Sequence, residues 1–95
     1  MLKENMLKKL IKAVGVIDAI TKEQDAYITV YGDCGETEVN IYSKMFNKLF
    51  DNYTIEERED EAFPYRKVSV CNGVKFYAIY AEEDLNPEEL KNEEV

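Results

Sequence analysis

The 95-residue chain is predicted to fold as one α+β domain, with two helices packed on one face of an antiparallel sheet of four to six strands. Three observations lead to this prediction: apolar residues at helical spacing in two segments, alternating apolar and polar residues in several others, and one Asn-Gly turn signal. The expected order is helix, two or three strands, helix, two or three strands, and a short acidic C-terminal helix or tail. Residues 1–84 are expected to form the domain and residues 85–95 the acidic segment.

The first expected element is an amphipathic helix over residues 2–14. Its apolar residues share one side of a helical wheel, and three lysines lie opposite: Leu2, Met6, Leu7, Leu10, Ile11, Ala13 and Val14 against Lys8, Lys9 and Lys12. Gly15 is a plausible end, and residues 16–21 then form either a strand or a continuation of the helix to about Ala19. Because glycine costs a helix about 1 kcal/mol relative to alanine and two β-branched residues follow, we expect a strand.

The next elements are a hairpin and a second helix. Residues 26–31 and 37–42 alternate as strands do, and the turn residues between them predict an antiparallel pair. A helix is expected to start near Ser43, because apolar residues then follow at i, i+3, i+4 and i+7, namely Phe46, Leu49, Phe50 and Tyr53.

The second half of the chain is expected to be a further set of strands. A strand opens at residues 53–55, Pro64 interrupts the pattern, and residues 66–71 and 74–80 are joined by Asn72-Gly73, the pair that a type I′ turn favours. Asn86 and Pro87 then predict a helix start, with Glu89 at the capping-box position and Leu85 placed to contact Leu90.

The patterns also predict which residues are buried. The expected core consists of Leu10, Val14, Ile28, Val30, Val39, Ile41, Phe46, Leu49, Phe50, Val68, Val70, Phe76 and Ala78. The other face of the sheet is expected to show Tyr27, Tyr31, Tyr42 and Tyr77, with Tyr65 as a further candidate. Aromatic residues on an open sheet face either pair across strands or bind a partner.

The composition argues against catalysis and against a cofactor or metal site. The chain has no histidine, so the usual general base is absent, and the turn at residues 32–36 matches neither a phosphate loop nor an EF-hand. Two cysteines cannot build a four-ligand zinc site, and we expect Cys71 to be a buried strand residue and Cys34 a turn residue. No apolar run reaches membrane-spanning length, and we expect a cytoplasmic protein that is not an enzyme.

The distribution of charge is the most informative functional feature. Residues 23–95 carry 18 acidic against seven basic residues, a net −11, whereas residues 1–22 carry +3. A rigid acidic surface can occupy a basic groove that otherwise binds nucleic acid; the alternative is that the acids only keep the protein soluble. The candidate partner-binding residues are Asp33, Glu36, Glu38, Glu56, Glu57, Glu59, Asp60, Glu61, Glu82, Glu83, Asp84, Tyr65 and Tyr77.

Two segments carry a resemblance to known proteins. VNIYSKMFNKLF (residues 39–50) and FPYRKVSVCNGVKFYAIY (residues 63–80) resemble segments of small acidic proteins encoded by phages and mobile elements of Gram-positive bacteria. The resemblance covers about half of the chain and rests on structural rather than functional motifs. Inhibitors from such elements include anti-CRISPR proteins and uracil-DNA glycosylase inhibitors that are acidic DNA mimics, and this chain is similar to them in size and charge.

Two functional hypotheses follow. The first, which the resemblance supports, is an inhibitor that binds a basic, nucleic-acid-binding host protein such as a CRISPR effector or another defence nuclease. The second is a homo-oligomeric or adaptor domain, a homodimer for example, that uses its tyrosine-rich sheet face. In neither hypothesis does the chain bind nucleic acid directly or associate with a membrane, because its net charge would repel phosphates.

Overall fold

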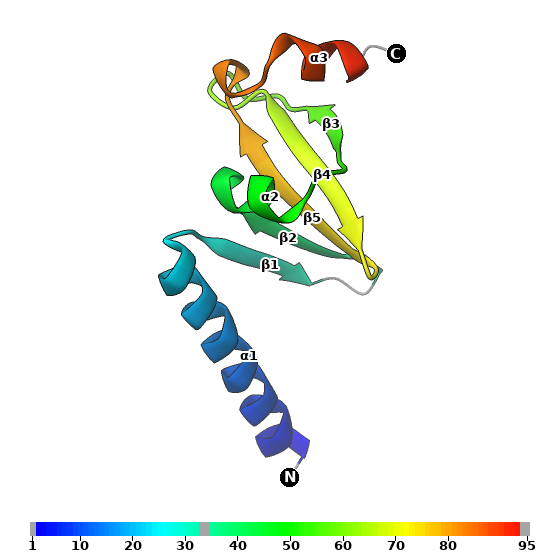
Figure 1. Cartoon of the computed structure of the whole chain (residues 1–95). Helices are drawn as coiled ribbons and strands as arrows, with labels where there is room; N and C mark the ends of the chain where they lie inside the picture. Colours follow the sequence, from blue (N-terminus) through cyan, green and yellow to red (C-terminus); the bar gives the residue numbers. More distant parts are fainter. Residues whose placement is uncertain (1, 33–34, 94–95) are drawn as a thin grey trace.

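The computed structural model describes residues 2–32 and 35–93 and confirms an α+β fold (Figure 1). In chain order the elements are α1 (Leu2–Gln24), β1 (Ile28–Gly32), β2 (Thr37–Ile41), α2 (Ser43–Leu49), β3 (Thr54–Glu57), β4 (Tyr65–Cys71), β5 (Val74–Tyr80), the 3₁₀ turn η1 (Glu82–Asp84) and α3 (Pro87–Glu93). The five strands form one sheet in the order β1-β2-β5-β4-β3.

The sheet is mixed rather than antiparallel, which corrects the sequence prediction. β1 pairs antiparallel with β2, and β3, β4 and β5 form an antiparallel meander, but β2 and β5 run parallel. Parallel neighbours need a long crossover, and here α2, β3 and β4 all lie between β2 and β5 in the sequence. The last strand therefore enters the middle of the sheet and joins the two hairpins.

The Asn-Gly turn between β4 and β5 is confirmed. Asn72 has φ 51° and Gly73 φ 79°, the two positive angles that a type I′ turn requires. The turn sets the register in which Cys71 pairs with Val74 and Tyr65 pairs with Tyr80. Directly paired residues point to the same side of a sheet, so this register decides which side chains of β4 face the core.

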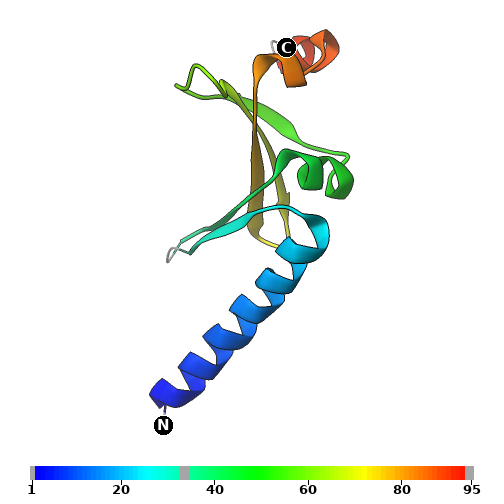
Figure 2. The ribbon, with the colours of Figure 1, turned by 90° about the vertical axis from the view of Figure 1, so that its left-hand side faces the viewer.

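The core lies on the sheet face that α2 covers (Figure 2). Five of the expected core residues are buried, namely Val39, Ile41, Phe46, Val68 and Ala78; Ile28, Phe50 and Phe76 are partly buried. Phe50 lies between two other rings, with centroid distances of 4.8 Å to Phe46 and 5.2 Å to Phe76. Tyr80 and Leu85 are also buried, although neither was expected to be.

For five residues the prediction of a core position is wrong, because these side chains are exposed: Leu10, Val14, Val30, Leu49 and Val70. Val70 shows the reason on β4. The register places Lys67 on the side of Ala78, so Val68 and Val70 point to the opposite face, where Val68 is buried and Val70 is 66% exposed. Cys71, expected to be buried, is exposed as well, and Cys34 lies outside the described residues.

The N-terminal helix does not stop at Gly15, and residues 16–21 are helical rather than a strand. The cost of one glycine is about 1 kcal/mol, which lowers helix stability without breaking the hydrogen-bond ladder. Beyond it, Ile17 and Ile20 continue the apolar spacing and are partly covered. Lys22 also pairs with Asp18 one turn earlier, at 2.9 Å.

The end of α1 is defined by Asp25. Its φ of 50° is left-handed, and the Ala26 amide donates to the Thr21 carbonyl at 3.1 Å. This bond from the second residue beyond the helix is the Schellman motif, in which glycine usually occupies the left-handed position. The chain is thereby turned out of the helix and into β1.

The sequence predicted that the N-terminal helix and the helix starting near Ser43 both pack on one face of the sheet. Only the second of these, α2, does so, because α1 does not pack on the sheet. In Figures 1 and 2 the helix projects away from the rest of the molecule, touching it only near its C-terminal end. The molecule measures 54 × 30 × 25 Å and its radius of gyration is 15.8 Å. A compact domain of this length has a radius of gyration of about 12 Å, so the difference reflects the projecting helix.

α3 begins as the sequence predicts. The Glu89 amide donates to Asn86 Oδ1 at 2.8 Å, and the Asn86 amide donates to Glu89 Oε1 at 3.2 Å, which together form a capping box. Leu85 is 7% exposed and joins the core just before the helix. The acidic C-terminal segment is therefore a helix attached to the domain.

We predict that Gly15→Ala stabilises α1. A methyl group at this position would contact no other atom within 4 Å, so the substitution adds helix propensity, about 1 kcal/mol, without a steric cost. Hydrogen exchange of α1 amides should slow by up to about fivefold, because exchange from a helix that packs little reports its local opening. Gly35→Ala in the β1–β2 turn region is the control; slower exchange in both variants would contradict the prediction.

Candidate interaction surfaces

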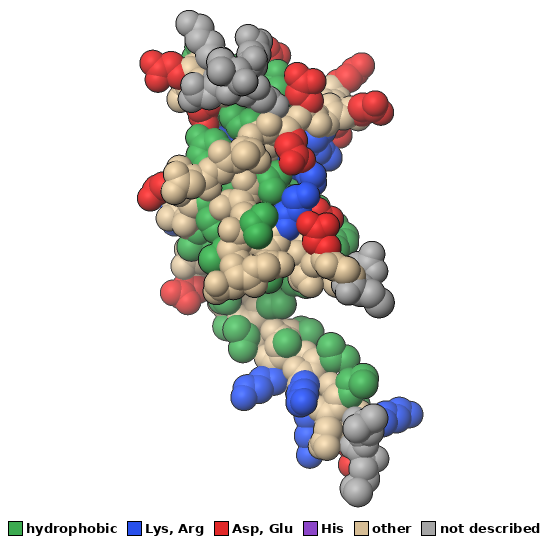
Figure 3. Space-filling model, turned by 90° about the vertical axis from the view of Figure 1, so that its right-hand side faces the viewer, with side chains coloured by type: hydrophobic (Ala, Val, Ile, Leu, Met, Phe, Trp, Pro, Cys, Tyr) green, Lys and Arg blue, Asp and Glu red, His purple; other side chains and the backbone are tan. Residues whose placement is uncertain are grey.

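Most candidate acidic residues gather at one end of the molecule. The β3–β4 loop, which carries Glu59, Asp60 and Glu61, lies at the same end as η1 and α3 (Figures 1 and 2). The loop extends to the side of the sheet away from α2, whereas α3 lies on the side of α2 (Figure 2). The lysines of α1 occupy the opposite end, so the charge asymmetry of the sequence is also an asymmetry in space (Figure 3).

The β3–β4 loop is held by its own hydrogen bonds. Asp60 Oδ1 accepts from the amides of Ala62 and Phe63, both at 2.9 Å. The Arg58 guanidinium donates to the Phe63 carbonyl at 2.7 Å, and the Arg58 amide donates to the Pro64 carbonyl at 2.7 Å. Asp60 therefore has a role inside the loop, and the loop presents its neighbouring acids in a defined shape.

Three of the candidate acids lie next to two basic residues on the sheet. Arg66 binds Glu56, with Nη2 2.5 Å from Oε1, and its Nη1 lies 3.9 Å from Glu38. The Lys75 ammonium lies 3.8 Å from Glu38 and 3.9 Å from Glu36. These pairs are partly exposed and contribute little stability, but they reduce the negative charge available to a basic partner.

The remaining acids divide into two groups. Asp84 Oδ2 accepts from the Ala81 amide at 3.2 Å and so caps η1, while Asp33 lies outside the described residues. In the described part of the chain, five exposed candidates form neither an ion pair nor a side-chain hydrogen bond: Glu57, Glu59, Glu61, Glu82 and Glu83. These five are the acidic surface that the fold leaves available, and we call them the acidic end.

The two candidate tyrosines lie on opposite faces of the sheet. Tyr77 shares the face away from α2 with Tyr31, and the Arg66 guanidinium lies 5.2 Å from its ring centroid. Burial, with smaller effects of Tyr31 and Glu38, raises the pKa of Tyr77, so it stays neutral. Tyr65 instead pairs with Tyr80 and packs against the core, which corrects its assignment to the tyrosine-rich face.

A row of exposed apolar side chains lies on α1, where the sequence predicted core. Five large side chains on one side of the helix are 55–62% exposed, namely Met6, Leu7, Leu10, Ile11 and Val14. We call them the apolar stripe. In Figure 3 hydrophobic side chains run along one side of the projecting helix, and most of its lysines lie on the other side. The amphipathic helix is confirmed, but its apolar side does not pack on the chain's own sheet, contrary to the sequence prediction.

A buried ion pair that the sequence analysis missed attaches α3 to the sheet. The Lys67 ammonium lies 2.7 Å from Glu89 Oε2, and the two side chains are only 7% and 17% exposed. The ammonium also lies over the rings of Tyr53 and Tyr80, 4.4 and 4.7 Å from their centroids. The only hint in the sequence is a lysine within an alternating apolar strand.

The same cluster shifts two pKa values in opposite directions. Burial raises the pKa of Glu89, but hydrogen bonds from Lys67, Tyr53 and the Asn86 amide, with the Lys67 charge, outweigh it and leave the pKa below its usual value. The hydrogen bond that Tyr53 donates to Glu89, at 2.5 Å, then burial, raise the pKa of Tyr53 to about 12. Both shifts favour a charged Glu89 and a neutral Tyr53.

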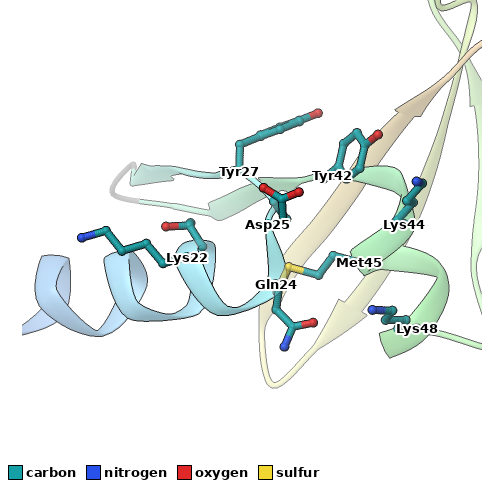
Figure 4. A pocket seen from close by; sticks show the side chains of 10 residues that line it. Lys22, Gln24, Asp25, Tyr27, Tyr42, Lys44, Met45 and Lys48 are labelled. Carbon is teal, nitrogen blue, oxygen red and sulfur yellow. The ribbon is translucent and has the colours of Figure 1, made fainter.

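A hollow of about 660 Å³ lies between the end of α1 and the start of α2 (Figure 4). Its lining includes one acidic residue, Asp25, and three lysines, Lys22, Lys44 and Lys48. All four side chains are exposed, so water screens their charges. The hollow adds a mixed-charge surface next to the base of α1.

Comparisons of the chain with protein-family models, with curated proteins and with solved structures found no match. Within residues 2–32 and 35–93, no helix has the length and apolar character needed to cross a bilayer, and His, Cys, Asp and Glu form no group of three that could hold a metal ion. The interaction surfaces must therefore be interpreted from their own chemistry.

We predict that Glu89→Gln destabilises the fold by about 2–4 kcal/mol at neutral pH, because it leaves the buried Lys67 ammonium without a counter-charge. Glu88→Gln is the matched control, since Glu88 is the exposed neighbour on the same helix. Urea unfolding followed by circular dichroism gives both values. Equal effects of the two substitutions would contradict a specific role for the ion pair.

The difference between wild type and Glu89→Gln should also depend on pH. Glu89 has a lower pKa in the folded than in the unfolded state, so its contribution is complete above its usual pKa of about 4.5 and is lost as pH falls through the folded value. The two stabilities should therefore converge in acid. A difference that stayed constant from pH 7 to pH 3 would mean that the glutamine acts through shape rather than charge.

Proposed function

We propose that the protein is a non-catalytic interaction protein, an adaptor or homo-oligomeric domain, that binds its partner through the apolar stripe of α1. A single observation carries this proposal. Five large apolar side chains on a projecting helix are each more than half exposed. Exposed apolar patches of this kind on a folded protein mark sites of interaction.

The position of the stripe supports the proposal. Among the described side chains of α1, only Ile17, Ile20 and Thr21 are partly buried, and all three lie near the base of the helix. The stripe lies further toward the N-terminus, clear of the rest of the molecule (Figure 1). A partner can therefore lie along the free part of the helix without displacing any element of the domain.

The tyrosine-rich sheet face is a weaker candidate for the binding surface than the apolar stripe. Tyr31 is 51% exposed, but the same face carries Arg66, Glu38, Glu56 and Lys75, which pair with one another. A partner would have to cover or break these pairs, whereas the apolar stripe contains no charged group that is already bonded within the chain.

Site-specific photocrosslinking tests the stripe. A photoreactive phenylalanine analogue at Leu10 should crosslink a partner in cells that express the protein, whereas the same analogue at Lys12, on the opposite side of the helix, should not. Mass spectrometry then identifies the product. Equal yields at both positions, or no product from position 10, would contradict binding through the stripe.

A second function is supported by the acidic end. Glu57, Glu59, Glu61, Glu82 and Glu83 are exposed, form no ion pair, and lie at one end of the molecule, at the end of β3, on the β3–β4 loop and on η1. We propose that these carboxylates occupy the basic groove of a nucleic-acid-binding host protein, such as a CRISPR effector or another defence nuclease. The phage or mobile-element setting implied by the resemblance is consistent with such an inhibitor.

Competition with DNA tests this second function. Immobilised protein should retain basic proteins from a bacterial lysate at low salt, and an added DNA duplex should elute them, because a mimic and the duplex compete for one groove. The triple variant Glu57→Gln, Glu59→Gln and Glu61→Gln should retain at least tenfold less of these basic proteins. Glu4→Gln, Asp18→Asn and Glu23→Gln, the same charge change on α1, form the matched control; equal losses would show only a general charge effect.

A further inference from the structure

We infer that the partner of the apolar stripe is a second copy of this chain, and that two α1 helices pair antiparallel about Leu10. The inference rests on the proposed function, because it names the occupant of the surface proposed there. It depends on three properties of α1: the position of the stripe along the helix, the distribution of charge, and the lack of other packing.

The stripe is centred on the part of the helix that is free. It runs from Met6 to Val14, so its midpoint is Leu10, and the rest of the molecule begins to cover the helix only at Ile17. In an antiparallel pair about Leu10, Met6 of one copy lies level with Val14 of the other. Each helix then ends where the partner's sheet domain begins. The same surface serves both copies, as a two-fold interface requires.

The charges on the helix fit this arrangement. Lys8, Lys9 and Lys12 lie on the other side of the wheel and stay in water when the stripe is covered. Residues 2–12 carry four lysines and one glutamate, a net +3, whereas residues 13–24 carry one lysine, Asp18 and Glu23, a net −1. Antiparallel pairing brings these unlike halves together, and it places Lys3 level with the turn that carries Asp18.

The rest of the chain also favours the antiparallel arrangement. Residues 25–95 carry 17 acidic and seven basic residues, a net −10. Parallel helices would place two such domains side by side, and they would repel each other. Antiparallel helices place them at opposite ends, about 45 Å apart along the helix axis at a rise of 1.5 Å per residue. That separation is several times the Debye length of about 8 Å at physiological salt. Each acidic domain then lies near the partner's lysine-rich end.

Pairing also explains how α1 can be a helix. Helices in proteins depend mainly on packing of their apolar side, and Gly15 weakens this helix further. The described residues of this chain cover only the base of α1. A second copy supplies the missing contacts, so helix formation and pairing are expected to occur together.

Sedimentation equilibrium over a wide range of protein concentration tests the inference. The wild-type chain should have twice the chain mass, and its helical circular dichroism should fall on dilution. Leu10→Glu places two carboxylates at the two-fold axis and should weaken pairing at least tenfold. Val16→Glu makes the same kind of substitution on the opposite side of the helix, at an exposed residue of the acidic half, and should not weaken pairing. Near-ultraviolet dichroism of the domain tyrosines verifies that each variant keeps its sheet domain.

Mixing variants separates self-pairing from any other role of the stripe. Leu10→Glu and Leu10→Lys should each be monomeric alone, and an equimolar mixture should form heterodimers. For orientation, in a background with Cys34→Ser and Cys71→Ser, Met6→Cys chains should form disulfides with Val14→Cys chains rather than with one another. Disulfides mainly between Met6→Cys chains would overturn the antiparallel arrangement.

Three results would overturn the inference altogether. They are a wild-type monomer at every concentration, a dimer that Leu10→Glu leaves intact, and a monomer whose helix forms only on lipid vesicles containing phosphatidylglycerol. The first two leave the proposed function open, because photocrosslinking from position 10 to a different protein would still support it. Failure of the crosslink at position 10 with an intact dimer would instead show that the dimer uses another surface.

Discussion

The buried ammonium of Lys67 constrains most of the folded domain. A charge in this position needs a counter-charge, and the only carboxylate that the described structure brings to it belongs to Glu89, so α3 must lie against the sheet. The ammonium also lies over Tyr80, whose hydroxyl donates to Asn47 Oδ1 at 2.8 Å and so reaches α2. One cation thus links β4, β5, α2 and α3.

The N-terminal helix is the opposite case, because nothing in the described chain constrains its outer part. In the domain, the polar contacts of Lys67 and Tyr80 hold the helices α2 and α3 against the sheet. In α1, by contrast, an apolar side is exposed to water. The molecule therefore has two parts with different chemistry: an acidic domain with a core of its own, and a basic amphipathic helix whose apolar side is exposed. A partner for the helix and a partner for the acidic end do not compete for the same surface.

Local features could be predicted from the sequence, and features that depend on distant pairing could not. The Asn72-Gly73 turn and the Asn86–Glu89 capping box are set by neighbouring residues, and both are confirmed. The parallel pairing of β2 with β5 and the inward position of Lys67 depend on residues far apart in the chain. For the candidate site, the acidic runs predicted exposed carboxylates. The sequence did not show that some of these carboxylates pair with Arg66 and Lys75, because the pairs form across strands.

The central place of β5 has a consequence for how the protein is made. β5 is the last strand to be synthesised, yet it lies between β2 and β4, so the β1–β2 hairpin has no neighbour until residue 80 has left the ribosome. α1 is complete long before that. If α1 pairs as we propose, two nascent or newly released chains can meet through their helices while their sheets are still open. The order of synthesis allows assembly to precede folding, and it leaves the exposed edge of β2 as the point at which a stalled chain would aggregate.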